Sequence, residues 1–214
     1  MVSGDAREMR RLRRAAGLVI AAHPDDEVLW AGSTLASGGW AAAVLTHRST
    51  RERVARLRGS AAALGANVAV FDLPDRRDQP PSADDLAQLT SLVARLVRLP
   101  GLERVMTHGP DGEYGHPYHR LVSTVVTSSI PAELPLWYFS FRENPDPVGP
   151  EAALRKHHAL RAYFDAKGAL PGWDAEHVIL SGFEHPVPAG EFVHSRSLVD
   201  SVYGRTPATE RRAS

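Results

Sequence analysis

The sequence predicts a single Rossmann-like α/β domain, in which a mostly parallel sheet carries helices on both faces. Two features of the 214 residues indicate this class: short apolar runs alternate with segments of helical periodicity, and Gly and Pro separate them. The chain is long enough to build one sizeable core, and its 43% of apolar residues is typical of a globular protein.

Five short apolar runs are predicted to be strands, at residues 15–22, 40–46, 67–74, 103–109 and 134–141. A strand that is covered on both faces reads as a continuous apolar run, as these do, and does not alternate. In such sheets ligands bind beyond the carboxyl ends of the strands, so the residues after each run are the first place to look for a site.

The segments between these runs carry helix signals. Ser82 with Asp85 three residues later is a variant of the capping box, and Gly65 is placed to end the helix before it. The predicted helices cover residues 27–37, 50–64, 82–99, 117–129 and 150–168, after an Arg-rich start over 1–14 that is either frayed or a surface helix.

We expect one domain over residues 1–200 and a flexible polar tail over 201–214. The N-terminus imitates a secretory signal, being basic and then apolar. Cleavage near Ala22 would however remove the strand that positions His23, so a cytoplasmic location is expected.

Composition excludes several classes of partner and cofactor. The formal net charge is +0, so nothing indicates binding to nucleic acid or to an acidic membrane surface. No apolar run approaches the ~20 residues that span a bilayer. The chain contains no cysteine, so any metal ion must be held by His, Asp or Glu.

The first charged cluster, HPDDE, follows the first predicted strand and contains His23, Asp25, Asp26 and Glu27. Two interpretations stay open for it. Carboxylates at a helix N-terminus cap the helix and complement its dipole. Alternatively, one carboxylate joins His23 on a metal ion while its neighbour points at a substrate water.

A second cluster, HGPDGEYGHPYHR, follows the fourth predicted strand and contains His108, His116 and His119. A catalytic zinc ion takes three N or O ligands and keeps a position for water, which two histidines and one carboxylate satisfy. A surface loop rich in His by chance is the other interpretation. Because both clusters follow buried strands, we expect them at the same edge of the sheet.

Taken together, AHPDDE and YGHPYH resemble the motifs of the PIG-L/LmbE family of zinc-dependent N-deacetylases, and the strand order is similar over roughly residues 15–140. The resemblance implies that His23, Asp26 and His119 are the zinc ligands. It also implies Asp25 as the general base for the zinc-bound water, with His116 stabilising the transition state and Tyr114 binding the developing oxyanion.

Further residues receive supporting roles. Glu27 orients a ligand or belongs to the first helical turn, and His108 supports the site from behind the ligands. Arg53 and Asp75 match family positions near the substrate, although Asp75 fits a plain turn equally well, and His47 lies at the same sheet edge as the site.

The predicted function is hydrolysis of an N-acetyl or N-acyl group from an amino sugar or small glycoconjugate, with Zn²⁺ or Fe²⁺ as cofactor. The alternatives are an amidase for a larger acyl group or a thiol conjugate, and a non-catalytic metal-binding module. The latter is motivated by Tyr118, which replaces an Asp of the family motif. Arg56 likewise replaces a family Glu, either toward an anionic substrate or on a solvated helix face.

Overall fold

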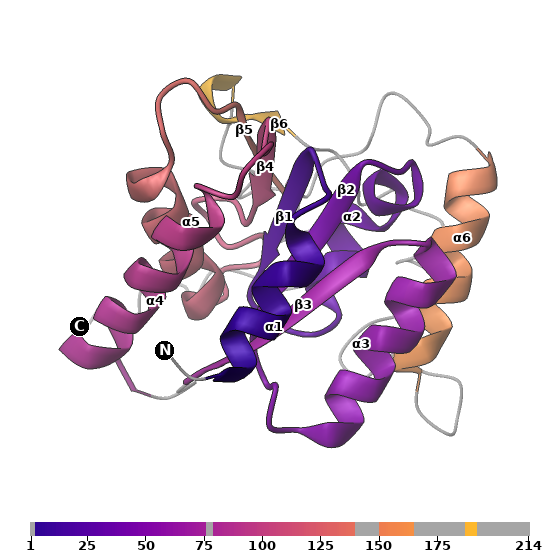
Figure 1. Cartoon of the computed structure of the whole chain (residues 1–214), viewed down its shortest axis with the longest axis horizontal. Helices are drawn as coiled ribbons and strands as arrows, with labels where there is room; N and C mark the ends of the chain where they lie inside the picture. Colours follow the sequence, from indigo (N-terminus) through magenta and orange to yellow (C-terminus); the bar gives the residue numbers. More distant parts are fainter. Residues whose placement is uncertain (1–2, 76–78, 140–149, 165–186, 192–214) are drawn as a thin grey trace, which may run out of the picture.

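The sheet has six strands in the order β3-β2-β1-β4-β5-β6 (Figure 1). The structure is a computed structural model, and it describes residues 3–75, 79–139, 150–164 and 187–191. Five strands run parallel, and short β6 pairs antiparallel with β5. The strands are β1 (Gly17–Ala21), β2 (Trp40–Thr46), β3 (Asn67–Leu73), β4 (Arg104–Thr107), β5 (Leu136–Tyr138) and β6 (Val187–Pro188).

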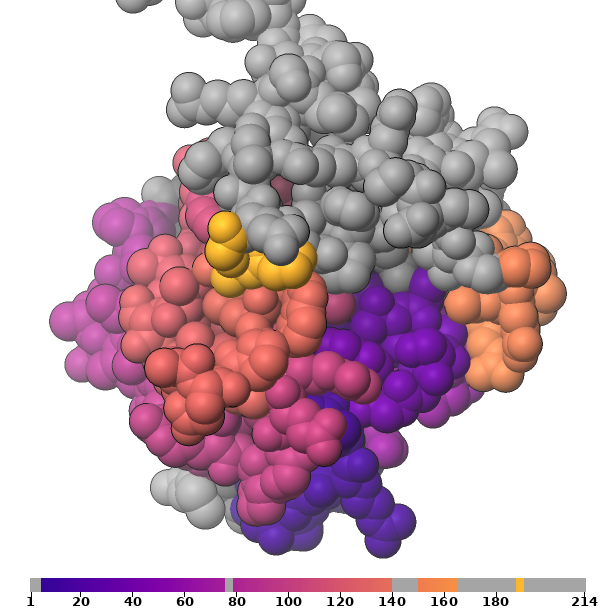
Figure 2. All heavy atoms as spheres, turned by 90° about the horizontal axis from the view of Figure 1, so that it is seen from above, coloured from indigo at the N-terminus to yellow at the C-terminus, as the bar shows by residue number. Residues whose placement is uncertain are grey.

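Helices cover both faces of the sheet. One face carries α2 (Asp26–Ala36), α3 (Arg51–Leu64) and α6 (Pro150–Leu160), which continues into the 3₁₀ helix η1 (Arg161–Tyr163). The other carries α1 (Ser3–Leu12), α4 (Ala83–Leu96) and α5 (Pro117–Ser129). The short 3₁₀ helix η2 (Ala189–Glu191) follows β6. Figure 2 shows α6 in orange against the violet part of the chain, where it contacts α2 and α3.

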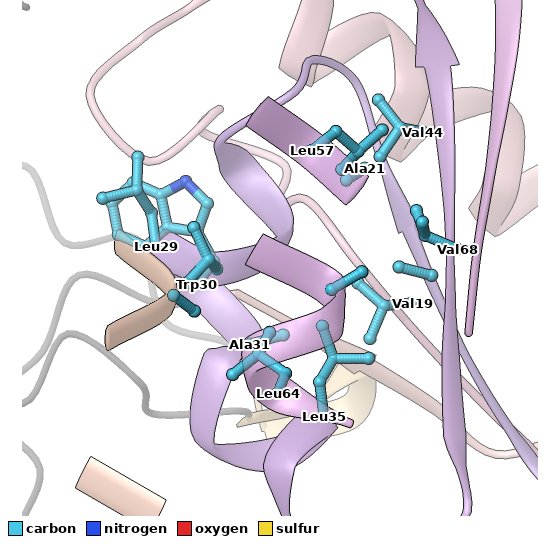
Figure 3. Packing of buried hydrophobic residues seen from close by; sticks show 14 of the residues in the cluster. Val19, Ala21, Leu29, Trp30, Ala31, Leu35, Val44, Leu57, Leu64 and Val68 are labelled. Carbon is cyan, nitrogen blue, oxygen red and sulfur yellow. The ribbon is translucent and has the colours of Figure 1, made fainter. Parts of the chain in front are cut away.

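The two layers are held by two apolar clusters. On one face, Leu29, Trp30 and Leu35 of α2 pack with Leu57 of α3 against Val19 of β1 (Figure 3). On the opposite face, α4 and α5 pack on the alternate residues of the same strands. Because both faces of the sheet are buried, β1 shows the continuous apolar sequence from which it was predicted.

Local signals set most of the helix boundaries. The Ser82 hydroxyl accepts the Asp85 N–H at 3.1 Å and the Asp85 carboxylate accepts the Ser82 N–H at 3.0 Å, so the predicted capping box is present. Gly65 ends α3 in the left-handed conformation with φ 69°. The Arg-rich start forms α1, whose buried Glu8 accepts the N–H of Val70 at 3.1 Å and so satisfies a donor of edge strand β3.

The predicted fold class is confirmed, with differences at the C-terminal side. The predicted helix over 150–168 ends at Leu160, and β5 is shorter than the apolar run that predicted it. The short strand β6 was not predicted, because two residues give no periodicity. The predicted tail over 201–214 lies outside the described residues. Among the described helices, none is long and apolar enough to cross a membrane.

The strand order places the topological switch point of the sheet between β1 and β4. From β1 the chain winds outward through β2 to β3, whereas from β4 it winds the other way through β5. At such a switch point the loops after the two central strands separate and leave room for a ligand. Both charged clusters of the sequence follow these strands, so the predicted meeting at one sheet edge is confirmed.

Candidate metal centre

The loops after β1 and β4 bring His23, Asp26 and His119 together. His23 Nδ1 lies 3.1 Å from His119 Nε2, although the two residues are 96 positions apart. Asp26 Oδ2 lies 3.3 Å from each of these nitrogens. Pro117 at the first position of α5 fixes the start of that helix and so places buried His119 in its first turn.

The three donor atoms have the spacing that a tetrahedral metal ion requires. With metal–ligand bonds of about 2.0–2.1 Å, the ligands of a tetrahedral ion are about 3.3 Å apart, and the three atoms here are separated by 3.1, 3.3 and 3.3 Å. Two imidazole nitrogens and one carboxylate oxygen also suit Zn²⁺ or Fe²⁺. The residues therefore fit a catalytic metal ion with further coordination positions open.

Each of these histidines has a carboxylate on its other ring nitrogen. Asp75 Oδ2 lies 2.9 Å from His23 Nε2, and Glu113 Oε2 lies 2.6 Å from His119 Nδ1. Carboxylates in this position fix the ring orientation and the tautomer of metal-binding histidines. The geometry thus assigns a positioning role to Asp75, while its contact with a substrate stays a prediction.

His108 lies within the same cluster but is not available as a ligand. Asp26, His108 and His119 have ligand atoms within 4.8 Å of one another, as do His23, His116 and His119. However, the His108 Nε2 accepts the N–H of Ala22 at 2.9 Å, so its lone pair is occupied. This agrees with the predicted supporting role of His108.

Asp25 lies beside the three donors and does not cap the helix. It occupies the N-cap position of α2, yet its side chain makes no capping hydrogen bond, and its backbone has φ 119°. Such a conformation is costly for a residue other than Gly and occurs mostly at functional sites. Burial, together with the charges of Asp26 and Glu27, raises the pKa of Asp25 to about 8.

Glu27 holds Asp25 in this conformation. The Glu27 Oε2 accepts the N–H of Asp25 at 2.9 Å, while Oε1 accepts the hydroxyls of Tyr163 at 2.7 Å and Ser60 at 3.2 Å. The residue is 1% exposed, and its burial raises the pKa of its carboxyl to about 7. Glu27 therefore supports Asp25, the predicted base, and does not orient a metal ligand as one interpretation of the sequence had it.

His116 and Tyr114 complete one wall of the site. The His116 ring lies 4.3 Å from the His119 ring and 5.0 Å from the His23 ring, between centroids. Its buried Nδ1 has no hydrogen-bond partner among the described residues. Burial and the charges of His119 and His23 lower the pKa of His116 to about 4. The Tyr114 ring packs edge-on at 5.8 Å from His116.

Other residues singled out from the sequence lie near His23 or Asp25. The His47 and Tyr118 rings lie 6.1 and 5.6 Å from His23, and the charge of Arg53 acts on Asp25. Arg56 instead binds Glu52 at 2.6 Å, so its charge is already paired within α3.

The electrostatics of the donor set favour a cation. Although burial opposes it, the charges of His119 and His108 hold the pKa of Asp26 well below its usual range. Burial lowers the pKa of His119, but Asp26 and Glu113 outweigh it and raise that pKa to about 10. In the absence of a metal, protons on histidine supply the positive charge that the carboxylates require.

This fold and these residues define an α/β protein that carries a candidate metal-binding cluster at the topological switch point of its sheet. The model of the PIG-L family, described as GlcNAc-PI de-N-acetylase, matches residues 18–130, more than half of the chain. The chain therefore belongs to this family, and the resemblance inferred from the two motifs is confirmed.

Comparisons with individual proteins identify one relative in sequence and several solved structures with a similar fold. Protein L374 of Acanthamoeba polyphaga mimivirus is 28% identical over 144 residues, which span 59% of this chain and 63% of that protein. The A40926 pseudoaglycone deacetylase Dbv21 superposes with a TM-score of 0.59 at 18% identity, covering 76% of this chain and 87% of Dbv21.

Two further solved structures share the fold. N,N'-diacetylchitobiose deacetylase from Pyrococcus horikoshii gives a TM-score of 0.52 at 15% identity, covering 71% of each chain. GalB, the 4-carboxy-2-hydroxymuconate hydratase of Pseudomonas putida KT2440, gives 0.53 at 20% identity, covering 72% of this chain and 80% of GalB. Because deacetylases and a hydratase share it, the fold alone does not select the reaction.

Two residues of the site were not found from the sequence. Glu113 lies among turn residues, which hide it in the sequence. Its position between two histidines of a Gly-rich loop is nevertheless a signal that it contacts them. Tyr163 reaches Glu27 from 136 positions away, and no local pattern indicates such a contact.

Proposed function

We propose that this protein is a metal-dependent N-deacetylase that removes an acetyl group from an N-acetylated amino sugar or a small glycoconjugate. The observation that carries the proposal is the triangle of His23, Asp26 and His119 with a non-capping carboxylate, Asp25, beside it. Membership of a family described as a de-N-acetylase, and a similar fold in Dbv21, support the same reaction.

His23, Asp26 and His119 would hold the metal ion, Zn²⁺ or Fe²⁺. When bound there, the ion supplies Lewis acidity at the amide carbonyl and lowers the pKa of a water molecule. Buried carboxylates on two ring nitrogens keep the histidine donors aimed at it.

Asp25 performs the proton transfers. Its carboxylate accepts a proton from the attacking water and returns that proton to the amine nitrogen as the C–N bond breaks. Its conformation, held by the Glu27 hydrogen bond to its N–H, turns the carboxylate away from the role of a helix cap.

His116 and Tyr114 act on the amide oxygen. A phenol hydroxyl and an imidazole at one wall of the site are suited to stabilise negative charge that develops on this oxygen in the transition state. We propose that Arg53, whose charge acts on Asp25, contributes to recognition of the sugar together with His47 and Asp75, which lie next to His23.

The test is a screen of N-acetyl amino sugars and their conjugates for released acetate, with zinc-loaded protein, chelated protein, and chelated protein to which zinc or iron is returned. Asp25→Asn should retain bound metal and lose about 10²–10⁴-fold in turnover. Asn is the matched replacement because it tolerates positive φ better than Ala does.

Asp84→Asn, an exposed carboxylate on α4, serves as the control and should keep full activity. Wild-type turnover in Asp25→Asn would overturn the assignment of the base. Metal retention without hydrolysis of any N-acyl substrate would instead favour a non-catalytic metal-binding module.

A further inference from the structure

Glu113 is a buried carboxylate to which no role was assigned from the sequence. It lies in the loop between β4 and α5, is 1% exposed, and has the left-handed backbone conformation with φ 58°. The carboxylate of Asp111 accepts the Glu113 N–H at 3.1 Å, which supports this turn. The turn buries the Glu113 side chain behind the metal centre.

Three donors converge on this carboxylate. The Glu113 Oε1 accepts the N–H of Gly109 at 2.8 Å. Its Oε2 lies 2.9 Å from the Nδ1 of His108 and 2.6 Å from the Nδ1 of His119. The rings of the two histidines stack at 3.9 Å between centroids, so one oxygen faces both.

The backbone N–H of Ala22, directly after β1, determines where the protons lie on the two histidines. The N–H of Ala22 can only donate, so His108 Nε2, at 2.9 Å from it, must be the acceptor. The hydrogen of neutral His108 is then on Nδ1, which donates to Glu113 Oε2. An Oε2 that already accepts this hydrogen bond also accepts one from the Nδ1–H of His119. In the neutral ring that would bind a metal ion, the lone pair of the His119 Nε2 is thereby left facing His23 and Asp26.

We propose that Glu113 is a positioning residue that fixes the tautomer of His119. His108 holds Glu113 in place, because its Nδ1 donates to Glu113 while its Nε2 accepts the N–H of Ala22, directly after β1. The proposal rests on the metal centre of the proposed function, and it assigns to the loop residue Glu113 a direct influence on metal affinity. Replacing the carboxylate by an amide changes the donor pattern, because an NH₂ group in the place of Oε2 would face two N–H groups. In the place of Oε1 the NH₂ group would face the N–H of Gly109, so neither orientation of the amide keeps all three hydrogen bonds. With the NH₂ group toward the histidines, His119 must change tautomer, because Ala22 holds His108.

Glu113→Gln should therefore weaken zinc binding by about 10–100-fold, the usual effect of losing a carboxylate behind a metal-binding histidine. The measurement is a titration of zinc-loaded protein with a chelator, followed by the zinc released. Glu133→Gln, an exposed Glu in the turn after α5, is the matched control and should release zinc as wild type does. Equal release curves for Glu113→Gln and wild type would overturn the proposal.

A second measurement needs no variant and stays informative if Glu113→Gln fails to fold. Imidazole ¹⁵N NMR of the zinc-loaded wild-type protein should show hydrogen on the Nδ1 of both His108 and His119. Hydrogen on the Nε2 of either ring would refute the tautomer assignment. Neither measurement uses a substrate, so a failure to release acetate bears on the proposed function alone.

Discussion

Tyr163→Phe should lower turnover although Tyr163 lies outside the metal centre. Its hydroxyl donates to Glu27 at 2.7 Å, and Glu27 in turn accepts the N–H of Asp25 at 2.9 Å. Burial and the nearby charge of Glu27 raise the pKa of Tyr163 well above its usual value, so the phenol stays protonated and donates. Without this hydroxyl, the side-chain donor left on Glu27 Oε1 is Ser60 at 3.2 Å.

The expected magnitude follows from these contacts. A hydrogen bond to a charged group contributes about 1.5–3 kcal/mol. For a protein of this length each kcal/mol shifts the melting temperature by about 2–4 °C, so we expect a decrease of roughly 3–12 °C. A displacement of about 1 Å at a catalytic group costs up to about 100-fold in rate. Since Ser60 retains part of the support, we expect about a tenfold lower kcat with KM nearly unchanged.

Tyr138→Phe is the matched control. Tyr138 is also 4% exposed, and its hydroxyl lies 2.6 Å from the Thr127 hydroxyl, away from Glu27. Both variants should have a lower melting temperature, but only Tyr163→Phe should have a lower kcat. The kcat is measured by acetate release at a temperature below the melting transition of either variant. Equal kcat values for the two variants would show that the contact stabilises the fold without positioning Asp25.

Three further outcomes are expected. Chelation of the purified protein should abolish acetate release, and returning zinc or iron should restore it. Chelation should also lower the melting temperature, since a ligand at 100 times its Kd adds about 2.7 kcal/mol to the free energy of unfolding. Recovery with neither ion would contradict the assigned donor set. Asp75→Asn should weaken zinc binding about 10–100-fold in a chelator titration if Asp75 positions His23, whereas a raised KM with unchanged zinc affinity would assign it to the substrate alone. Ser82→Ala removes the capping hydroxyl that accepts the Asp85 N–H and should cost about 0.5–2 kcal/mol in urea unfolding without changing activity; loss of activity at full folding would contradict the separation of α4 from the site.

The regular part of the fold could be predicted because its signals are local. The apolar run at 40–46 is β2, and the helices expected over 50–64 and 117–129 are α3 and α5 to within one residue. Where the signal is weak the prediction fails. The two-residue strand β6 depends wholly on pairing with β5, and the end of α6 at Leu160 carries no Gly or Pro.

In the candidate site, too, the features with local sequence signals could be predicted and those that depend on long-range contacts could not. His23, Asp26 and His119 could be named as candidate ligands because AHPDDE and YGHPYH resemble the motifs of the family. The hydrogen bonds that support the site could not be predicted from the sequence. The bond between Asp75 and His23 joins residues 52 positions apart, and the bond from Tyr163 to Glu27 joins residues 136 positions apart. Glu113 could be predicted only in part. It lies six residues before His119, which is a local signal, but its side chain faces inward because of a positive φ that the sequence does not predict.

The assignment of different tasks to the neighbours Asp25 and Asp26 follows from the backbone at β1. Asp26 is the first helical residue of α2, and its Oδ2 accepts the N–H of His23 at 2.8 Å while facing the other two donors. Asp25, with φ 119°, leaves the helical path just before it, so its carboxylate cannot share that direction. Both residues carry the same chemical group, and it is their backbone conformation that gives them the different roles we propose, Asp26 as metal ligand and Asp25 as base. The hydrogen bond from the Asp25 N–H to Glu27 supports this arrangement, together with the Asp25 carbonyl, which accepts the N–H groups of Val28 at 3.1 Å and Leu29 at 2.9 Å. These contacts hold the turn in which the two carboxylates diverge, so the proposed chemistry depends on the turn as well as on the carboxylates.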